Sequence, residues 1–456
     1  MANKTFILDT NILLDFPNAL FAFEDNEVIL TEQVLEELNS FKKHMDDIGA
    51  NARIVTRALE ELRKKGNLFD GVTINHTGSL TISMNKDDID LPSTWTLDNP
   101  DHKILQVCKF YKQQNKDVTL ITNDIVLRIK SDILQIKAEG FQDLNLDQQY
   151  TGRCEIHLLD EDFQKFYEQD YIEINKAQLL RYNQFGISEI YTDPIYPNEF
   201  VLMKNSVGST ALGQVDDKVA KIKKLRYRNF HPFGITPKNT AQQFMIEALM
   251  SDIPLVIIKS NAGCGKTLLS LACGLQLVAE EQKFRRILIS KSTVSLENEQ
   301  IGWLPGTESE KIDPFLRSVY DNLSILVDSN EKERYENEKN LQSKIHYFFD
   351  NGLIEAQALS FLRGRSIAKQ YMYIEEGQNI SINQMKTIVT RVAEGTKLII
   401  SGDVEQIDKP YLNKYNNGLS WISEKMKGSP LTVQVTAFAN ECIRSKLAED
   451  AIMRLK

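Results

Sequence analysis

The chain has 456 residues, of which 42% are hydrophobic and 26% are charged, and its formal net charge is −9. This length exceeds that of one ordinary core and predicts two or three soluble globular domains. No run approaches the ~18 apolar residues of a membrane span, and the N-terminal residues show no signal-peptide pattern, so a cytoplasmic protein without a membrane partner is expected. The acidic charge argues against a generally basic nucleic-acid coat but is compatible with a local basic channel.

The five cysteines, Cys108, Cys154, Cys264, Cys273 and Cys442, are scattered along the chain and form no C-x-x-C motif. This spacing disfavours both a disulfide framework and a zinc site. The six histidines show no metal-ligand spacing either. Neither residue type therefore predicts a metal site.

Short apolar runs alternate with helical patterns over residues 4–150. Buried parallel strands are predicted where apolar runs end in polar or acidic residues, at FILDTNILL, EVILT and VTLITND. Amphipathic helices, apolar at i, i+3 and i+4, are predicted at EQVLEELNSFKKHM and NARIVTRALEELRKKG. The pattern indicates a small α/β domain, in which groups at the carboxyl ends of parallel strands converge on one crevice.

Four acidic residues of this domain are expected at that crevice. Asp9 and Asp124 end strands, Glu37 lies in a helix, and Asp101 lies at a predicted helix start. Several carboxylates in one crevice repel one another and are tolerable mainly when a hard divalent cation neutralises them. One or two Mg²⁺ or Mn²⁺ ions could then activate a water for phosphodiester cleavage. Each acid also has an ordinary interpretation, as a helix cap, a turn residue or a solvated side chain.

These residues resemble the PIN domain family, with Asp9-Thr10-Asn11 as the opening signature and ITNDIVLRIKSD as the closing one. The resemblance covers residues 4–150 and implies a three-layer α/β fold, a metal site formed by the four acids, and strand cleavage that depends on Asp9 and Asp124. Glu36 and Glu37 both fit the family's helix position, and Glu37 is preferred because it directly precedes Leu38. Asp98 is a candidate for an outer-shell acid.

Residues 151–235 break this rhythm and predict a small β-rich insert or linker. Strand-like pieces alternate there with Pro, Gly and Asn turns, at YIEINKAQLL, EFVLMKN and TALGQVD. The segment closes with KVAKIKKLRYRNF, which places six basic residues between Lys218 and Arg228. Charge combined with aromatic stacking would suit a path for a nucleic-acid strand, formed by Lys221, Lys223, Lys224 and Arg226 with Tyr227 and Phe230 nearby. The alternative is a solvated charged segment.

A second α/β pattern occupies residues 236–456 and contains a phosphate-binding loop. The strand PLVIIKS runs directly into SNAGCGKTLLSLACG, and a helix follows, which is the context such a loop requires. Gly263 and Gly265, with Cys264 between them, let backbone N–H groups turn toward phosphate oxygens. Lys266 supplies a point charge to the terminal phosphates, and Thr267 can hold Mg²⁺.

Two later strands end in acidic residues. The strand YMYIEEGQN ends in Glu375 and Glu376, where a first carboxylate normally holds the magnesium-bound water and a second polarises the attacking water. The strand KLIISGDVEQ ends in Asp403 and Gln406, a carboxylate and an amide placed to sense the γ-phosphate. Either strand end alone could be a helix cap, but both follow a phosphate loop in the right order. The sequence therefore predicts an ATPase.

This region resembles superfamily 1 helicase motors, which are RecA-like, and more closely the PhoH family. The matching segments are GITPKNTAQQ, NAGCGKT, WLPGTESEKIDPFLRSVYDNL, FLRGRS, EEGQNISINQMKTIVTR, SGDVEQID and ANECIRSKLAED. The resemblance implies that Gln242 contacts adenine and that Arg363, Arg365 or Arg444 reaches a γ-phosphate or nucleic acid, without assigning which. Two features depart from the family: Glu375 replaces the usual aspartate, and SLENEQIG lacks an expected glycine-bearing segment.

Fusions of PIN and PhoH domains are a known architecture, and the expected function is an ATP-dependent RNA helicase or translocase coupled to metal-dependent ribonuclease cleavage. Only 50 residues follow Gln406, short of the ~100 of a further domain. A second motor must then come from a neighbouring subunit, and the resemblance implies a hexameric ring of identical chains. The alternatives are a motor whose PIN domain grips or assembles without cutting, and an ATP-switched regulator. The choice between single-stranded RNA and DNA stays open.

Overall fold

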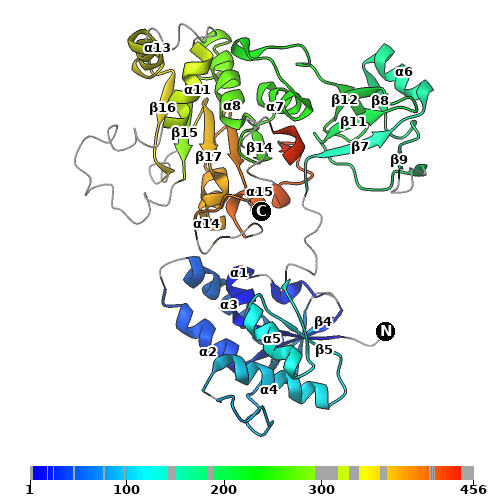
Figure 1. The fold of residues 1–456 in the computed structure, drawn as a ribbon, viewed down its shortest axis with the longest axis vertical. Helices are drawn as coiled ribbons and strands as arrows, with labels where there is room; N and C mark the ends of the chain where they lie inside the picture. The colour runs from blue at the N-terminus through cyan, green and yellow to red at the C-terminus, as the bar shows by residue number, and fades with distance from the viewer. Residues whose placement is uncertain are drawn as a thin grey trace. The chain divides into compact units, whose positions relative to one another are not determined.

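The computed structural model shows two compact units, Met1–Gln149 and Tyr150–Lys456 (Figure 1). Not one of the helices it describes is long and apolar enough to cross a membrane. It describes residues 4–442 with the exception of 18, 24, 45–46, 75–77, 97, 142–149, 183–187, 293–316, 328–337, 360–366, 410–411, 413 and 415.

The N-terminal unit is built on a six-stranded sheet in the order β3-β4-β2-β1-β5-β6. All neighbouring strands are parallel except β3 and β4. The strands are β1 (Thr5–Leu8), β2 (Glu27–Thr31), β3 (Val72–Ile74), β4 (Gly78–Ser83), β5 (Val118–Ile121) and β6 (Lys137–Glu139). This sheet confirms the expected α/β fold.

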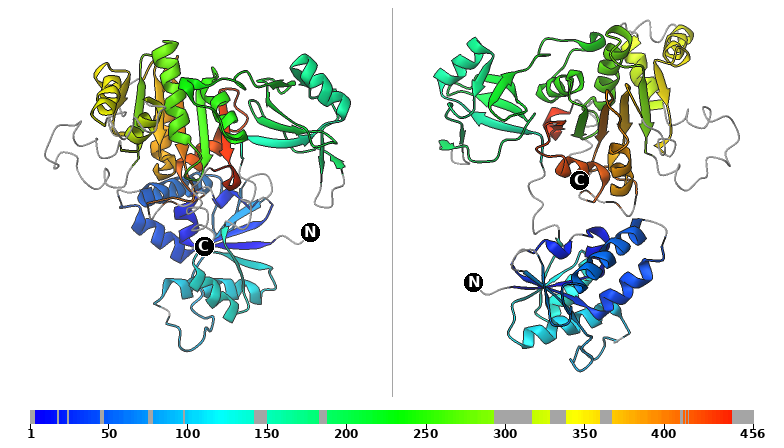
Figure 2. Two further views of the ribbon diagram at one scale, coloured as in Figure 1. Left: turned by 45° about the horizontal axis from the view of Figure 1, so that its top comes forward. Right: turned by 180° about the vertical axis from the view of Figure 1, so that it is seen from behind.

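Helices of this unit lie on both faces of the sheet (Figure 2). The chain runs from β1 outward to β4 and then crosses back to β5 and β6. Because parallel crossovers are right-handed, this reversal places the earlier and the later helices on opposite faces. The helices are α1 (Thr10–Asp15), η1 (Ala19–Phe21), α2 (Glu32–Phe41), α3 (Asp47–Arg63), α4 (Pro100–Gln113) and α5 (Ile125–Ile133).

The segment FILDTNILL, predicted as one strand, is instead a strand followed by a helix. β1 ends at Leu8, and the Asp9 carboxylate accepts a hydrogen bond from the N–H of Thr10 at 2.6 Å as α1 begins. An apolar run of this length does not distinguish a buried strand from a buried helix. The strand prediction was therefore wrong beyond Asp9.

The second unit contains an all-parallel six-stranded sheet in the order β16-β15-β17-β18-β14-β19. Its strands are β14 (Leu255–Ser260), β15 (Ile287–Lys291), β16 (Ile354–Ala356), β17 (Tyr371–Glu375), β18 (Lys397–Gly402) and β19 (Thr432–Ala437). Its helices are η3 (Pro232–Gly234), α7 (Thr240–Met250), α8 (Lys266–Leu275), η4 (Gln276–Glu280), α11 (Arg317–Val327), α13 (Glu338–Asp350), η8 (Gly377–Asn379), α14 (Ile382–Val389), α15 (Gly418–Lys425) and η9 (Ala439–Glu441).

Alternating strand residues of this sheet enter two separate cores. Val256 and Ile258 of β14 pack with residues of α7, α8 and α11 on one face. Leu255 and Ile257 pack with residues of α14 and α15 on the other. This alternation follows from the two-residue period of a strand, and it confirms a doubly covered α/β sheet.

A second, β-rich sheet belongs to the same unit and has the order β10-β9-β7-β11-β12-β13-β8. Its helix α6 packs Phe163 and Phe166 into the core of this sheet. The predicted strand YIEINKAQLL is divided into β8 and the start of β9. The elements are β7 (Arg153–His157), α6 (Asp160–Gln169), β8 (Tyr171–Glu173), β9 (Leu180–Tyr182), β10 (Ser188–Ile190), β11 (Phe200–Lys204), β12 (Thr210–Val215) and β13 (Lys221–Lys224).

The β-rich sheet is fastened to the ATPase sheet beside β19. The Arg153 guanidinium pairs with the Glu441 carboxylate at 2.8 Å, and the Asn198 amide donates to the carbonyls of Pro430 and Thr432. Gly152 has φ +74°, and a Cβ there would lie 2.3 Å from the carbonyl oxygen of Gln434. The contact therefore requires glycine at this position.

Replacing Gly152 with alanine should destabilise the second unit more than replacing Gly208. Gly208 also has a positive φ, +81°, but a Cβ there would meet nothing within 4 Å. Gly208→Ala should cost about 1 kcal/mol for the left-handed backbone alone, while Gly152→Ala adds the overpacking cost of roughly 1–3 kcal/mol. Urea unfolding of the two variants measures the difference, and equal midpoints would contradict the tight contact at Gly152.

Candidate active sites

The phosphate loop joins β14 to α8 at the carboxyl edge of the second unit's parallel sheet. Gly263 and Gly265 adopt left-handed φ values of 84° and 87°, and Gly265 is the N-cap of α8. A side chain at either position would be strained in this conformation. This conformation and the start of the helix are what an anion-binding loop requires.

Lys266 of the phosphate loop is held by the loop's own carbonyl groups. Its ammonium donates to the carbonyl oxygens of Ser260 at 2.8 Å and Asn261 at 3.0 Å. Burial lowers the pKa of Lys266, while the nearby Asp403, Glu376 and Glu375 act to raise it. Phosphate oxygens would compete with these carbonyls for the same ammonium, and the phosphate contact of Lys266 stays a prediction.

Glu375 and Thr267, both predicted to bind at the magnesium position, are in contact. The Thr267 hydroxyl donates to one oxygen of the Glu375 carboxylate, and the hydroxyl of Ser318 on α11 donates to the other at 3.2 Å. Glu375 is buried, and Lys291 on the neighbouring strand β15 lies 3.5 Å from it. An oxygen-rich site with a hydroxyl and a carboxylate suits a Mg²⁺ ion and its waters.

Glu376 is positioned by an unusual backbone conformation and by Gln378. The residue has φ 56°, in the left-handed region that non-glycine residues rarely adopt, and strain of this kind is often found at functional sites. The Gln378 amide donates to Glu376 at 2.7 Å and to the carbonyl of Gln406 at 2.8 Å. The Gln378 side-chain oxygen accepts from the N–H of Asp403 at 3.1 Å. Gln378 thus connects the strand ends that carry Glu376 and Asp403.

The remaining predicted ATP-site residues lie around the loop. Asp403 accepts the N–H of Ala262 at 2.9 Å, so this carboxylate contacts the loop directly. The Gln242 amide donates to the carbonyl of Cys264 at 3.2 Å, and its oxygen accepts the N–H of Lys238. The adenine contact of Gln242 stays a prediction, and Arg363, Arg365 and Arg444 lie outside the described residues, as does most of the WLPG block.

In the N-terminal unit, Asp9 is a buried acid directly after β1. Desolvation raises its pKa to about 6 despite hydrogen bonds from Thr122 and Thr10. The charges of Glu37 and Asp101 act to raise the pKa of Asp9 further. A buried carboxylate with raised pKa near other acids favours a bound cation.

The other predicted acids are partly engaged in local structure. Asp124 caps α5 by accepting the N–H of Val126 at 2.7 Å, Glu37 accepts the amide of Gln33 at 3.0 Å, and Asp101 pairs with Lys130 at 3.4 Å. The N-cap of α4 is Asn99 rather than Asp101. Within the described part of the chain, no three acidic, histidine or cysteine side chains are grouped closely enough to hold a metal ion.

Several site residues were not predicted from the sequence. Thr122 donates its hydroxyl to Asp9 at 2.6 Å and accepts the N–H of Asp124 at 3.0 Å, linking two of the acids. Lys291 ends β15 directly opposite Glu375. The signal that identified the acidic strand ends could have found both, because each also lies at the carboxyl end of a parallel strand. Ser318 and Gln378 gave no comparable signal.

The basic segment predicted to bind a nucleic-acid strand is largely paired within the β-rich sheet. Lys224 forms an ion pair with Asp170 at 2.6 Å, Lys223 lies 3.9 Å from Asp216, and Lys221 lies 4.0 Å from the centre of the Tyr171 ring. The carboxylate of Glu247 accepts the backbone N–H of Arg226. Tyr227 and Phe230 pack against the ATPase core. The binding of a nucleic-acid strand by this segment stays a prediction.

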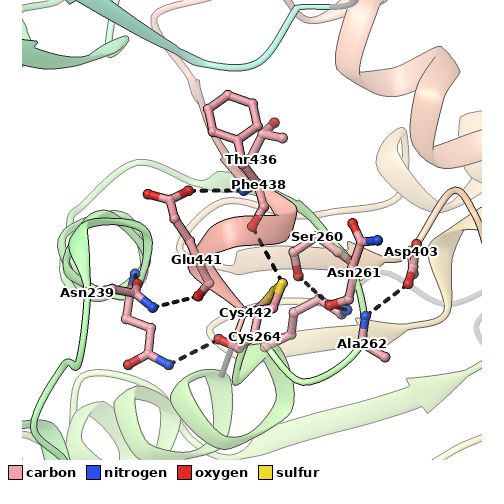
Figure 3. Close-up of a disulfide and its surroundings, with 12 residues drawn as sticks. Asn239, Ser260, Asn261, Ala262, Cys264, Asp403, Thr436, Phe438, Glu441 and Cys442 are labelled. Atoms are coloured by element: carbon pink, nitrogen blue, oxygen red, sulfur yellow. Dashed lines mark hydrogen bonds between the residues drawn. A yellow bond between two sulfur atoms is a disulfide. The ribbon is translucent and has the colours of Figure 1, made fainter. Parts of the chain in front are cut away.

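A disulfide joins Cys264 of the phosphate loop to Cys442, 178 residues later (Figure 3). The scattered cysteine spacing gave no indication of this pair, because the sequence does not show which distant residues are adjacent. Cys108, Cys154 and Cys273 are free.

Known proteins resemble the whole chain. A family profile described as "PIN domain" matches residues 6–142, and one described as "PhoH-like protein" matches residues 234–455. "Protein PhoH2" of Bacillus subtilis is 36% identical over 460 residues and covers 98% of both chains. "Protein PhoH2" of Thermobispora bispora and that of Mycolicibacterium smegmatis are each 28% identical, over 98% of this chain and 95% of theirs.

The parallel sheet, the phosphate loop and the acidic strand ends define a P-loop ATPase that carries a nuclease-like domain. The chain belongs to the PhoH2 family and joins a PIN domain to a PhoH-like domain.

The two acids at the end of β17 should respond differently to neutral substitution. Glu376→Gln should bind ATP but hydrolyse it roughly 10²–10⁴-fold more slowly, because it loses the general base. Glu375→Gln should mainly raise the Mg²⁺ concentration needed for half-maximal turnover. Steady-state ATPase assays across a Mg²⁺ titration measure both effects. Glu405→Gln is the control, since this exposed acid pairs with Lys414; a reversal of the two effects would mean that the roles are exchanged.

Asp9 should make the metal-free protein less stable as pH rises. The folded pKa is about 6, above its ordinary value of 3.8, so ionisation between these values disfavours the folded state. Relative to Asp9→Asn, the wild type should lose on the order of 2 kcal/mol between pH 4 and pH 7. Thermal unfolding in a chelator measures this loss.

Asp132→Asn removes the same charge from an exposed position of the same unit and should behave like wild type at every pH. Added Mn²⁺ should stabilise the wild type more than Asp9→Asn, by the linkage of binding to folding. If the stability of Asp9→Asn and of the wild type changed identically with pH, the raised pKa of Asp9 in the folded protein would be contradicted.

Proposed function

We propose that this protein is a cytoplasmic, ATP-driven motor on single-stranded RNA whose PIN domain cuts the strand in a metal-dependent reaction. The observation that carries the proposal is the presence of two separate candidate sites in one chain. One is the phosphate loop with Glu375, Glu376 and Asp403 beside it, and the other is the buried Asp9 with its raised pKa.

In the ATPase site, different side chains would have different roles in ATP hydrolysis. Lys266 would exchange its carbonyl partners for phosphate oxygens, and Glu376, held by Gln378, would accept a proton from the attacking water. Thr267 and Glu375 would hold Mg²⁺, which supplies charge neutralisation at the phosphates. Asp403 contacts the phosphate loop and, through Gln378, the base Glu376. Loss of the γ-phosphate would therefore change the contacts of the residues that follow β18.

In the PIN domain, Asp9, Glu37, Asp101 and Asp124 would hold one or two Mg²⁺ or Mn²⁺ ions. Bound there, the cation supplies an activated water for phosphodiester cleavage. The raised pKa of Asp9 supports this assignment, since an opposite charge would relieve the cost of its ionisation. Thr122 would orient Asp9 by the hydrogen bond that it already donates.

A ring of identical chains, a hexamer by family resemblance, is part of the proposal. The described part of the second unit contains a single parallel sheet of the ATPase type, and a helicase motor clamps ATP between two such domains. A neighbouring subunit would then supply the second surface and an arginine in trans, and light scattering during turnover tests the assembly.

A second candidate function is that the PIN domain grips or assembles without cutting. The Asp124 carboxylate is used as a helix cap, and α5 behind it exposes a row of apolar side chains, Ile125, Val126, Ile129 and Ile133, each 57–64% exposed. Exposed apolar patches mark contact surfaces more often than catalytic ones.

Separate inactivation of the two sites tests the proposal. Lys266→Ala should abolish ATP hydrolysis and spare metal-dependent cleavage of a short unstructured RNA, because the cleavage ligands lie in the other unit. Asp9→Asn should abolish cleavage and leave ATP hydrolysis near the wild-type rate. Labelled RNA and DNA strands with Mg²⁺ or Mn²⁺ provide the readout. Active ATP hydrolysis without any cleavage by the wild type would replace the nuclease with the gripping function.

A further inference from the structure

The Cys264–Cys442 disulfide lies in the middle of the nucleotide site. Cys264 stands between the two glycines of the phosphate loop, and Cys442 follows η9, just after β19. Their Cα atoms are 4.2 Å apart. Figure 3 shows the pair between the loop residues Ser260 to Ala262 and the turn formed by Phe438 and Glu441.

The fold places these cysteines together through contacts that do not involve the sulfur atoms. β14 and β19 are adjacent parallel strands whose last residues, Ser260 and Ala437, are paired. The Asn239 amide donates to the carbonyl of Glu441 at 2.6 Å, and Arg153 holds the Glu441 carboxylate. The two sulfurs are therefore neighbours in the reduced protein as well, and the disulfide can form or break without rearrangement of the strands.

We propose that Cys264 and Cys442 form a reversible redox modification site that controls nucleotide binding, with the dithiol as the binding form and the disulfide as the weakened form. The proposal rests on the P-loop ATPase function of the same site. In the proposed cytoplasmic location, disulfides of this kind are usually transient rather than structural.

The disulfide should weaken nucleotide binding because the phosphate loop must break internal hydrogen bonds before it can bind phosphate. Lys266 donates to Ser260 and Asn261 within the loop, and the N–H of Ala262 is donated to Asp403. Phosphates require both the ammonium and the N–H groups to turn toward them. A covalent tie from Cys264 to the turn after β19 restricts the segment that has to move. Reduction removes this restriction.

The chemistry balances with a small-molecule disulfide as the oxidant. Cys442, 9% exposed against 1% for Cys264, loses its proton and attacks the oxidant, forming a mixed disulfide and releasing one thiol. Cys264 loses its proton and attacks the Cys442 sulfur, releasing the second thiol. Two cysteine thiols are oxidised to one disulfide, and the small disulfide is reduced to two thiols; excess thiol reverses both steps.

Nucleotide binding and oxidation must affect each other equally. If the disulfide weakens binding of Mg·ADP by a given factor, then saturating Mg·ADP must shift the thiol–disulfide equilibrium toward the dithiol by the same factor. This reciprocity gives two independent measurements, neither of which depends on catalytic turnover.

The experiment uses the full chain equilibrated with reduced and oxidised glutathione. Fluorescent ADP with Mg²⁺ reports the Kd, and alkylation followed by peptide mapping reports the fraction of Cys264 joined to Cys442. We expect the Kd of the oxidised protein to be higher by about tenfold or more, and saturating Mg·ADP to lower the disulfide fraction correspondingly. Cys442→Ser should bind nucleotide like the reduced wild type under every condition.

Cys154→Ser is the matched control, because it removes a free cysteine of the same unit and should keep the full redox response. The proposal would be overturned by equal Kd values for oxidised and reduced wild type, or by the absence of a Cys264–Cys442 link at every glutathione ratio. Both results are measured on the wild-type protein, so misfolding of Cys442→Ser would not affect them. Reduced wild type that fails to bind nucleotide would instead overturn the ATPase function itself.

Discussion

A carboxylate at the end of a buried parallel strand loses much of its hydration, so its charge has to be met by donors, ammonium groups or a cation. Both units place buried acids in this position. In the ATPase, Glu375 is met by Thr267, Ser318 and Lys291. In the PIN domain, Asp9 has two hydrogen-bond donors but also the repulsion of Glu37 and Asp101, and its pKa rises to about 6. Among the described residues, Asp9 therefore has no ammonium partner comparable to the Lys291 that lies beside Glu375.

Two lysines lie beside the acids of the ATPase site, and a bound nucleotide could replace some of their contacts. Lys266 is bound to carbonyl oxygens and acted on by three carboxylates, and Lys291 stands 3.5 Å from Glu375 and 3.9 Å from Glu376. Mg²⁺ would bring positive charge to these carboxylates, and phosphate would bring negative charge to these lysines. The loop can therefore accept them by redistributing hydrogen bonds, without leaving a buried charge unbalanced.

The sequence allowed the fold class and the strand-end acids to be predicted, because both follow from local patterns. The apolar period locates strands, and parallel strands collect their carboxyl ends at one edge. The helix α1 that follows Asp9 was not predicted from FILDTNILL, since an apolar run of this length does not distinguish a buried strand from a buried helix. Gln378 and the Cys264–Cys442 pair were also not predicted. Their roles come from residues distant in the sequence, and no local pattern encodes such adjacency. In the basic segment at 218–228, the charge run also did not indicate that Lys223 and Lys224 lie beside the acids Asp216 and Asp170.

The β-rich sheet is better understood as part of the ATPase than as a linker. β19 is the edge strand of the parallel sheet, and an exposed edge invites pairing with other chains. The β-rich sheet packs beside this edge. The carbonyl of Tyr150, just before that sheet begins, accepts hydrogen bonds from the amide of Gln434 and from the ammonium of Lys259, the latter at 3.0 Å. Burial lowers the pKa of Lys259 to about 8, while the charge of Glu424 acts to raise it. Arg153 holds Glu441 from the same sheet. The turn that presents Cys442 to the phosphate loop is thus fixed from outside the parallel sheet, and the position of that turn depends on the β-rich sheet being folded.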